Sequence, residues 1–468
     1  MVFEARPWNA WRCNAFVLPL TLVLTMLVVA LSAQGGDTFN WDKKQNRVSV
    51  DIRSLQLNPL LEQVASATGW QVYLEPDTAH NVSAKFKDLS PGEALRLLLG
   101  DLNFALVPEG SAKPRLYVFR TVQRNATRLI VPQKKNARGK IIPNELVVTL
   151  KPGAKIDELA KLLGAKVTGQ ISGLNAYRLE FENQEAANAA REQLATNSDV
   201  ASVDNNYSVD RPSLPTESTI AGGGPPHLQL NPPPANGRVV VGLVDTAIQS
   251  LGGDLDKFML SPISVAGEAH PAADSPTHGT SMAETILRSL EMTTKGSTSV
   301  QILPVDVYGP NESTSTWTIA EGIKKAVDGG ATILNLSFGS EGDSPFLRDL
   351  LKDAVQKNIG VFAAAGNQPV TTPFYPAAYS DMGIIAVTAT DHGQIADYAN
   401  RGSFVTAAAP GTSLIYFNGQ QWYAVGTSAA TAVASGMAAG YMDTTRSDVN
   451  KMKSFIQATL GVKQGKAP

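Results

Sequence analysis

The sequence predicts an α/β protein in which a doubly wound parallel sheet, over residues 238–445, is preceded by two small α+β domains. The first indication is length, since 468 residues are too many for one ordinary domain. The second is that near-continuous apolar runs alternate with helical segments after residue 238, as in buried parallel sheets. The third is that short strands and amphipathic helices fill the region before residue 210, ahead of a Pro/Gly-rich stretch.

The parallel strands are predicted from apolar runs, and the segments between them have the spacing of helices. The strands are expected at 239–244, 301–305, 331–336, 360–365 and 384–388. The helices are expected at 281–290, 317–328, 346–357 and 432–441. Folds of this class place their sites at the carboxyl ends of the strands, so the chemistry is expected there.

Composition excludes some classes of function and predicts no cofactor. The net charge of −2 gives no indication of nucleic-acid binding, and the single cysteine, Cys13, excludes a cysteine-based zinc site. No histidine pair has the helical spacing of metal ligands. Calcium binding is an alternative, but the acidic residues between 245 and 278 are scattered, which favours a solvent-exposed face over a metal site: Asp254, Asp256 and Glu268.

Residues 1–33 have the order of an export signal. Arg6 and Arg12 precede an apolar run over 15–31, and small residues follow, with cleavage expected after Ala33. The same run is close to the length that spans a bilayer, so an uncleaved anchor is the alternative. Either way the chain is expected to be exported, and to be periplasmic, membrane-anchored or secreted.

The first small domain is expected over residues 40–120, as short strands around two helices. Ser90 and Glu93 have capping-box spacing before the second helix. Its segments DIRSLQLNPLLEQVASATGWQVYLEPD and LSPGEALRLLLGDLNFALV resemble the short N-terminal domain of secretins and TonB-dependent receptors. The resemblance implies a periplasmic interaction module without chemistry, and hence an envelope protein partner. An unrelated small α/β domain is the alternative.

The second small domain is expected over residues 144–210, in the order strand, helix, strand, helix, strand. It ends in VASVDNNYSVDRP and resembles the I9-type inhibitory propeptides of subtilisin-like proteases. The resemblance implies that the chain's own propeptide is an intramolecular inhibitor. A generic ferredoxin-like module has the same periodicity, and the domain's position before the parallel sheet favours the propeptide. The Pro/Gly-rich residues 211–237 are expected to be extended, exposed and easily cut, with self-cleavage between 210 and 226.

Four polar residues stand where strands end or helices begin. Asp245 and Asn367 follow predicted strands, whereas His278 and Ser428 open predicted helices. Each alone also fits a bland interpretation: a helix cap, a turn residue, a loop histidine or a small packing residue. Together they supply a nucleophile, a base, a carboxylate that orients the base, and an oxyanion donor. The backbone N–H of Ser428 is the expected second oxyanion donor.

Five segments resemble the signature segments of subtilisin-like serine proteases, the peptidase S8 family: VVVGLVDTAI, THGTSMAETI, ILNLSFGS, AAAGNQP and GTSAATAVASGMAAG. The resemblance covers residues 238–445 and leaves 446–468 as a C-terminal tail. It implies that Asp245, His278 and Ser428 form the triad and that Asn367 is the oxyanion donor. It also implies that the segment Ser337, Phe338 and Gly339 pairs with substrate backbone. Ser281 and Thr431 depart from the family's usual histidine and proline.

The sequence thus predicts an exported serine endopeptidase made as a self-processing zymogen, with proteins or peptides as substrates. The alternative is a catalytically silent envelope interaction protein that uses the protease fold as a scaffold.

Overall fold

The computed structural model describes residues 38–462, except 43–45, 76–77, 79, 108–113, 131–138, 219–223 and 236. The chain divides into two compact units, residues 1–136 and 137–468. The predicted export signal, with Cys13, lies outside the described residues.

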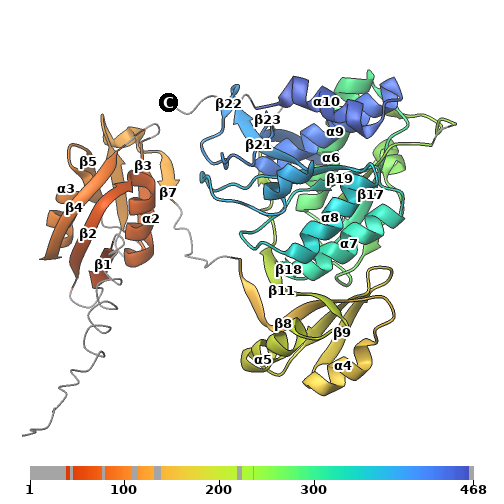
Figure 1. The fold of residues 1–468 in the computed structure, drawn as a ribbon. Helices are drawn as coiled ribbons and strands as arrows, with labels where there is room; N and C mark the ends of the chain where they lie inside the picture. Colours follow the sequence, from red (N-terminus) through yellow and green to blue (C-terminus); the bar gives the residue numbers. More distant parts are fainter. Residues whose placement is uncertain are drawn as a thin grey trace, which may run out of the picture. The chain divides into compact units, whose positions relative to one another are not determined.

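The described residues of the first unit form two small sheets and the helices α2 and α3 (Figure 1). One sheet has the order β1-β2-β4 and the other β5-β6-β3-β7. The elements are β1 (Thr38–Asp42), β2 (Arg47–Gln56), α2 (Leu57–Thr68), β3 (Gln71–Leu74), β4 (Asn81–Leu89), α3 (Pro91–Leu99), β5 (Asn103–Val107), β6 (Arg115–Phe119) and β7 (Arg128–Ile130). The expected capping box is present, because the Ser90 N–H donates to the Glu93 carboxylate at the start of α3. Strands β1 and β7 extend the module beyond its expected bounds.

The module that follows contains one strand more than the sequence pattern predicts. Its elements are β8 (Ile141–Leu150), α4 (Ile156–Leu163), β9 (Lys166–Ile171), β10 (Ala176–Glu180), α5 (Gln184–Ala195) and β11 (Val200–Asp210). Strand β9 is at the sheet edge and mostly half-buried, so it lacks a clear alternation of apolar and polar residues. Strand β11 runs to the end of the module, where residues 208–210 pair with β18 (Ser313–Ser315).

The large domain is built on a sheet with the order β15-β17-β14-β19-β20-β21-β22, with β23 also beside β21. Every pair is parallel except β21 with β22, which confirms the doubly wound fold. The strands are β14 (Val240–Asp245), β15 (Ile263–Ser264), β17 (Gln301–Asp306), β19 (Ile333–Leu336), β20 (Gly360–Ala364), β21 (Ile385–Asp391), β22 (Gln394–Ile395) and β23 (Ala407–Pro410). Short strands outside this sheet are β12 (Thr216–Glu217), β13 (Gln229–Leu230), β16 (Ser297–Thr298), β24 (Thr412–Phe417) and β25 (Gln420–Val425).

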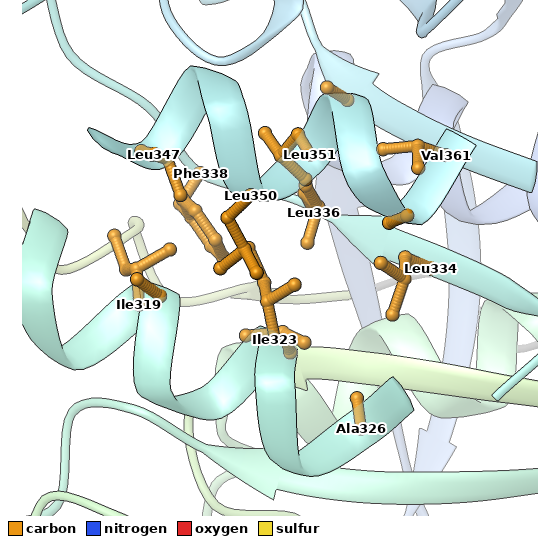
Figure 2. Close-up of a cluster of buried hydrophobic side chains, with 14 of the residues drawn as sticks. Ile319, Ile323, Ala326, Leu334, Leu336, Phe338, Leu347, Leu350, Leu351 and Val361 are labelled. Carbon is orange, nitrogen blue, oxygen red and sulfur yellow. The ribbon is translucent and has the colours of Figure 1, made fainter. Parts of the chain in front are cut away.

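Helices cover both faces of the large sheet and enclose two buried apolar clusters. Helices α7 (Thr316–Asp328) and α8 (Pro345–Gln356) supply Ile323 and Leu350 to one cluster, against Leu334 and Leu336 of β19 (Figure 2). On the other face lie α6 (His278–Thr294) and α9 (Thr427–Thr445), which contain small residues at their contact. A Cβ at Gly436 would lie 2.8 Å from the Ile286 carbonyl, so this glycine permits close helix packing.

The expected C-terminal tail is wrong for residues 449–460, which form the helix α10 (Val449–Leu460). Asp448 caps it by accepting a hydrogen bond from the Lys451 N–H at 2.9 Å. Its buried residues are Val449, Met452 and Ile456, which are spaced so that they lie on one helical face. The prediction of a polar tail missed this spacing. Across the described residues, no helix combines the length and apolar character needed to cross a membrane.

Candidate active site

The first two predicted site residues form a buried acid–base pair. Asp245 is the last residue of β14, and His278 is the first residue of α6. His278 Nδ1 lies 2.8 Å and 3.0 Å from the two carboxylate oxygens of Asp245. Asp245 also accepts the Thr246 N–H at 2.7 Å, which fixes the carboxylate. With Nδ1–H donated to Asp245, Nε2 is left as the basic atom of the ring.

A glycine after the histidine lets this pair form. Gly279 packs so closely on the loop after β14 that a Cβ there would lie 2.2 Å from the Thr246 carbonyl oxygen. Its N–H donates to Thr246 Oγ1 at 2.8 Å. Thr277 caps α6 by accepting the Thr280 N–H and also donates to the Ala247 carbonyl at 2.7 Å. The Thr-His-Gly-Thr order therefore joins the start of α6 to the end of β14.

Ser428 lies in the first turn of α9, in the same cleft as His278. Its Oγ donates to the Ser337 carbonyl at 3.0 Å, and Ser337 Oγ donates back to the Ser428 carbonyl at 3.2 Å. The hydroxyl must therefore turn away from Ser337 to donate to the imidazole. Catalytic hydrogen bonds often tighten in this way only when substrate is bound.

Asn367 is held by its oxygen and presents its amide nitrogen. Its Oδ1 accepts the Thr427 N–H at 2.8 Å and Thr427 Oγ1 at 3.0 Å. Gly426 makes room for this side chain, because a Cβ there would lie 2.9 Å from Asn367 Nδ2. Gly366, at φ +104°, passes so near Asn400 that a Cβ would lie 2.5 Å from its Nδ2. The two glycines thus position an amide donor beside Ser428.

The segment of Ser337, Phe338 and Gly339 lines the cleft. The Phe338 ring is 4% exposed and points into the core among the residues of α7 and α8 (Figure 2). A Cβ at Gly339 would lie 2.3 Å from the Phe374 ring, so the chain can follow this path only with glycine. Such an arrangement leaves main-chain groups, rather than the Phe338 side chain, to meet a peptide.

The chain itself enters the cleft after β11. Residues 210–215 line the same cleft as His278, Asn367 and Ser428. The next residues form β12, where Thr216 pairs with Tyr423 and Glu217 with Trp422 of β25. Ser213 and Leu214 are exposed, as expected for this segment, but strand pairing on either side of the cleft holds the segment in place.

Polar residues of the module at 141–210 cap the helices that it touches. Asn206 Oδ1 accepts the Trp317 N–H and Thr316 Oγ1, both at 3.0 Å, at the start of α7. Asp204 accepts the Phe346 N–H at the start of α8, and its burial raises its pKa to about 6. Both residues lie in the segment VASVDNNYSVDRP, from which this capping role was not predicted. The sequence feature that indicates this role is an Asp and an Asn in the last strand of the module, because both residue types are good helix caps.

The acidic residues between 245 and 278, and the two residues that depart from the family pattern, either make ordinary hydrogen bonds and ion pairs or are exposed to solvent. Asp254 pairs with Lys257 at 2.6 Å, and Asp256 accepts Ser250 Oγ at 2.6 Å, whereas Glu268 is exposed. Among the described residues, no group of three or more His, Cys, Asp or Glu side chains could hold a metal ion. Ser281 and Thr431 are buried and donate to the carbonyls four residues earlier in their helices.

Comparison with known proteins gives two family matches. The subtilase family matches residues 236–465, and the fervidolysin N-terminal prodomain matches residues 130–206. Fervidolysin from Fervidobacterium pennivorans, a keratinolytic enzyme related to subtilisin, superposes with a TM-score of 0.53 at 17% identity. That superposition covers 69% of this chain and 58% of fervidolysin, and it shows a shared fold.

Sequence similarity to named proteases is higher. The chain is 30% identical over 205 residues to the thermophilic serine proteinase of Bacillus sp. strain AK1, covering 42% of this chain and about half, 51%, of that protein. It is 32% identical over 226 residues to thermitase of Thermoactinomyces vulgaris, covering 47% of this chain and 80% of thermitase. The chain therefore belongs to the subtilase family, and a fervidolysin-like prodomain precedes its peptidase domain.

Proposed function

We propose that this chain is an exported serine endopeptidase, made as a zymogen that cleaves itself. The observation that carries the proposal is the shared cleft. The cleft is lined by His278, whose imidazole is hydrogen-bonded to the buried Asp245, by Ser428 and by the chain's own residues 210–215. The subtilase match supports the same chemistry.

In the proposed reaction, His278 Nε2 takes the proton of Ser428 Oγ as the oxygen attacks the peptide carbonyl carbon. The carbonyl π pair moves to its oxygen, where Asn367 Nδ2 and the Ser428 N–H stabilise the negative charge. As that pair returns, the C–N bond breaks and His278 gives its proton to the leaving amine. Water then repeats the sequence on the acyl-enzyme and restores Ser428. Asp245 stabilises the imidazolium in both halves.

Substrates are proposed to be proteins or peptides in extended form. The chain's own β11 pairs antiparallel with β18, and its β12 pairs antiparallel with β25. A substrate that followed the same course would add a strand on each side of Ser428, an interaction that depends on main-chain hydrogen bonds. The backbone of Ser337 and Gly339 borders the cleft between these pairings.

Self-cleavage is proposed within residues 211–215, a narrower range than the sequence alone gave. Pro212 and Pro215 make the bonds before them tertiary amides, which leaves Pro212–Ser213 and Ser213–Leu214 as the secondary amides of this segment. We propose one of these two as the scissile bond. The module ending at residue 210 then remains as an inhibitor of the mature domain until it dissociates.

We propose that the first unit is an interaction module for an envelope protein. Its support is the resemblance to the short N-terminal domain of secretins and TonB-dependent receptors, and its own closed apolar core. Together with the export signal predicted at 1–33, this supports our proposal that the protein is exported to the periplasm, the membrane or the outside of the cell. Deleting residues 38–130 should leave hydrolysis of a soluble protein intact and abolish recovery of an envelope partner by crosslinking in cells.

Labelling with a fluorophosphonate, alongside casein hydrolysis, tests the protease assignment. The processed protein should label and hydrolyse casein. Ser428→Ala should do neither, with activity lower by roughly 10⁶-fold. The control is Ser454→Ala, which removes an exposed serine of α10 and should behave as the wild type. A folded, processed protein that neither labels nor hydrolyses casein would instead favour the silent scaffold.

A further inference from the structure

The side chain of Arg211 occupies a defined recess where the chain enters the cleft. Its Nε donates to the Asn311 carbonyl at 2.8 Å and its Nη2 to the Gly309 carbonyl at 2.7 Å. The guanidinium carbon lies 5.5 Å from the centre of the Tyr308 ring. The backbone N–H of Arg211 donates to the Glu312 carbonyl at 2.9 Å. The guanidinium is therefore held on one face by an aromatic ring and at its edge by two carbonyls.

The turn that forms this recess is fixed independently of Arg211. Asp306 Oδ1 accepts the N–H groups of Tyr308 and Gly309, both at 2.9 Å. Asn311 donates back to the Tyr308 carbonyl through its backbone at 3.1 Å and its side chain at 3.0 Å. At Gly309, with φ +54°, a Cβ would lie 2.2 Å from the Ala266 carbonyl. The two acceptor carbonyls are thus positioned in advance.

A buried carboxylate gives the recess its charge. Asp306 is only 5% exposed, and its Oδ2 has no hydrogen-bond partner among the described residues. Burial raises the pKa of Asp306 and the charge of Asp245 adds to the rise, whereas the N–H groups of Gly309 and Tyr308 and the charge of Arg211 lower it. A cation in the recess therefore favours the ionised carboxylate beneath it.

We propose that this recess is a substrate subsite for an arginine side chain, which Arg211 fills in the zymogen. The proposal rests on the proposed function, because it assigns to substrates the path that residues 210–215 take through the cleft. Arg211 is the second residue before the Pro212–Ser213 bond and the third before the Ser213–Leu214 bond, so the subsite would bind a side chain two or three residues before the bond to be cut. A planar guanidinium can donate to both carbonyls while facing the ring, whereas a lysine ammonium is a point charge that cannot reproduce the fork.

Peptide substrates test the subsite on the processed protein. The reference peptide has the sequence of residues 206–218, and matched peptides carry alanine or lysine in place of Arg211. The arginine peptide should be cleaved with a kcat/KM about tenfold to a hundredfold above that of the alanine peptide, with the lysine peptide between them. Casein hydrolysis in parallel reports activity that does not depend on this one side chain.

Enzyme variants locate the preference in the recess. Tyr308→Phe keeps the ring and should keep the arginine-to-alanine ratio, whereas Tyr308→Leu and Asp306→Asn should each lower it about fivefold or more. The ratio is taken within one sample, so a partly unfolded variant still reports it, and fluorophosphonate titration gives the active fraction. Ratios unchanged in both Tyr308→Leu and Asp306→Asn would contradict the assignment to this recess.

Failure of the subsite and failure of the proposed function give different results. Casein hydrolysis with arginine and alanine peptides cleaved within twofold of each other, or with neither cleaved, would overturn the subsite alone. Absence of both casein hydrolysis and fluorophosphonate labelling would overturn the proposed function, and the subsite with it.

Discussion

The first unit and the module at 141–210 are both small α+β domains, yet they bury their apolar residues differently. Among the described residues, the buried cluster of the first unit is built from side chains of that unit, including Leu60 and Leu98. The module at 141–210 has a cluster of its own around Val148, but it also contributes Val147 and Val209 to the buried cluster of the large domain. One domain is complete by itself, whereas the other shares part of its core with its neighbour.

The alternation of β8 explains the difference. Leu146, Val148 and Leu150 point towards the module's own helices, whereas Val147 points towards the large domain. On that second face, Gly169 allows the Trp317 indole to approach, since a Cβ there would lie 2.9 Å from the ring. The first unit should therefore act as a separable module, whereas the other module is shaped as a ligand of the peptidase domain.

Removing core volume from the first unit should have the largest effect on stability and the least effect on catalysis. Leu60 is fully buried, so Leu60→Ala should lower the free energy of unfolding of the first unit by about 2–5 kcal/mol. Calorimetry of the full chain should show one transition at a lower temperature, while the rate of casein hydrolysis is unchanged. A parallel loss of activity would break the contrast between the two domains.

Removing a helix cap should weaken the contact between the other module and the peptidase domain. Asn206→Ala leaves the Trp317 N–H and the Thr316 hydroxyl at the start of α7 without their acceptor, at a cost of about 1–3 kcal/mol. After self-cleavage, less of the module should co-elute with the peptidase domain in gel filtration. The matched control is Asn183→Ala, which removes the cap of the module's own α5. Equal loss of co-elution in both variants would mean that Asn206 acts only on the module's own stability.

The same contact should weaken as pH rises from about 4 to 6. The pKa of Asp204 is raised from 3.8 to about 6 in the docked module, chiefly by burial and by the charge of Asp349, against the lowering effect of Arg191, the Phe346 N–H and Arg348. Docking therefore favours the protonated acid. This contribution is complete below pH 3.8 and is lost as pH rises through about 6, a change of roughly 1–3 kcal/mol.

The module's dissociation constant from the peptidase domain, measured across this range, checks the sign. Asp204→Asn keeps an acceptor for the Phe346 N–H without the charge, so it should flatten the curve and bind more tightly at pH 7. Tighter binding of the wild type at pH 7 than at pH 4, with Asp204→Asn unchanged, would contradict the assignment to Asp204.

The smallest effect is expected from an exposed ion pair. Lys140 lies 2.9 Å from Asp210, with their side chains 43% and 64% exposed. Because water and salt screen such a pair, Lys140→Ala should change the affinity of the module by less than about 1 kcal/mol. Isothermal titration at two salt concentrations measures this, and a loss comparable to that of Asn206→Ala would mean that this pair, which joins the two ends of the module, is needed to hold β11 in its docked position.

Much of the large domain could be predicted from sequence, because its buried strands are continuous apolar runs and its polar site residues follow them directly. Strand β14 and Asp245 are the clearest case. The order of Asp245, His278, Asn367 and Ser428 along the chain is enough to predict the candidate site from the sequence alone. The helix at 449–460 was not predicted because its apolar residues are interspersed with polar ones in a segment interpreted as a polar tail, and strand β9 was not predicted because it lacks a clear alternation of apolar and polar residues.

The path of residues 211–215 could not be predicted, for a different physical reason. Local composition favours an exposed linker, and only tertiary pairing with β18 and β25 holds it in the cleft. The recess around Arg211 was missed in the same way. The recess depends on the backbone carbonyls of Gly309 and Asn311. Because every residue has a backbone carbonyl, the sequence does not show which of them will accept a hydrogen bond.

The central claim is that Ser428 cuts the chain's own segment where that segment crosses the cleft. Intact mass and N-terminal sequencing of the purified wild type and of Ser428→Ala, both made in a protease-deficient host, test it most directly. We expect the wild type to give a mature fragment that begins at Ser213 or Leu214, and Ser428→Ala to remain uncut between residues 211 and 215. Cleavage of Ser428→Ala at the same bond, or a wild type left whole at this segment, would contradict the account.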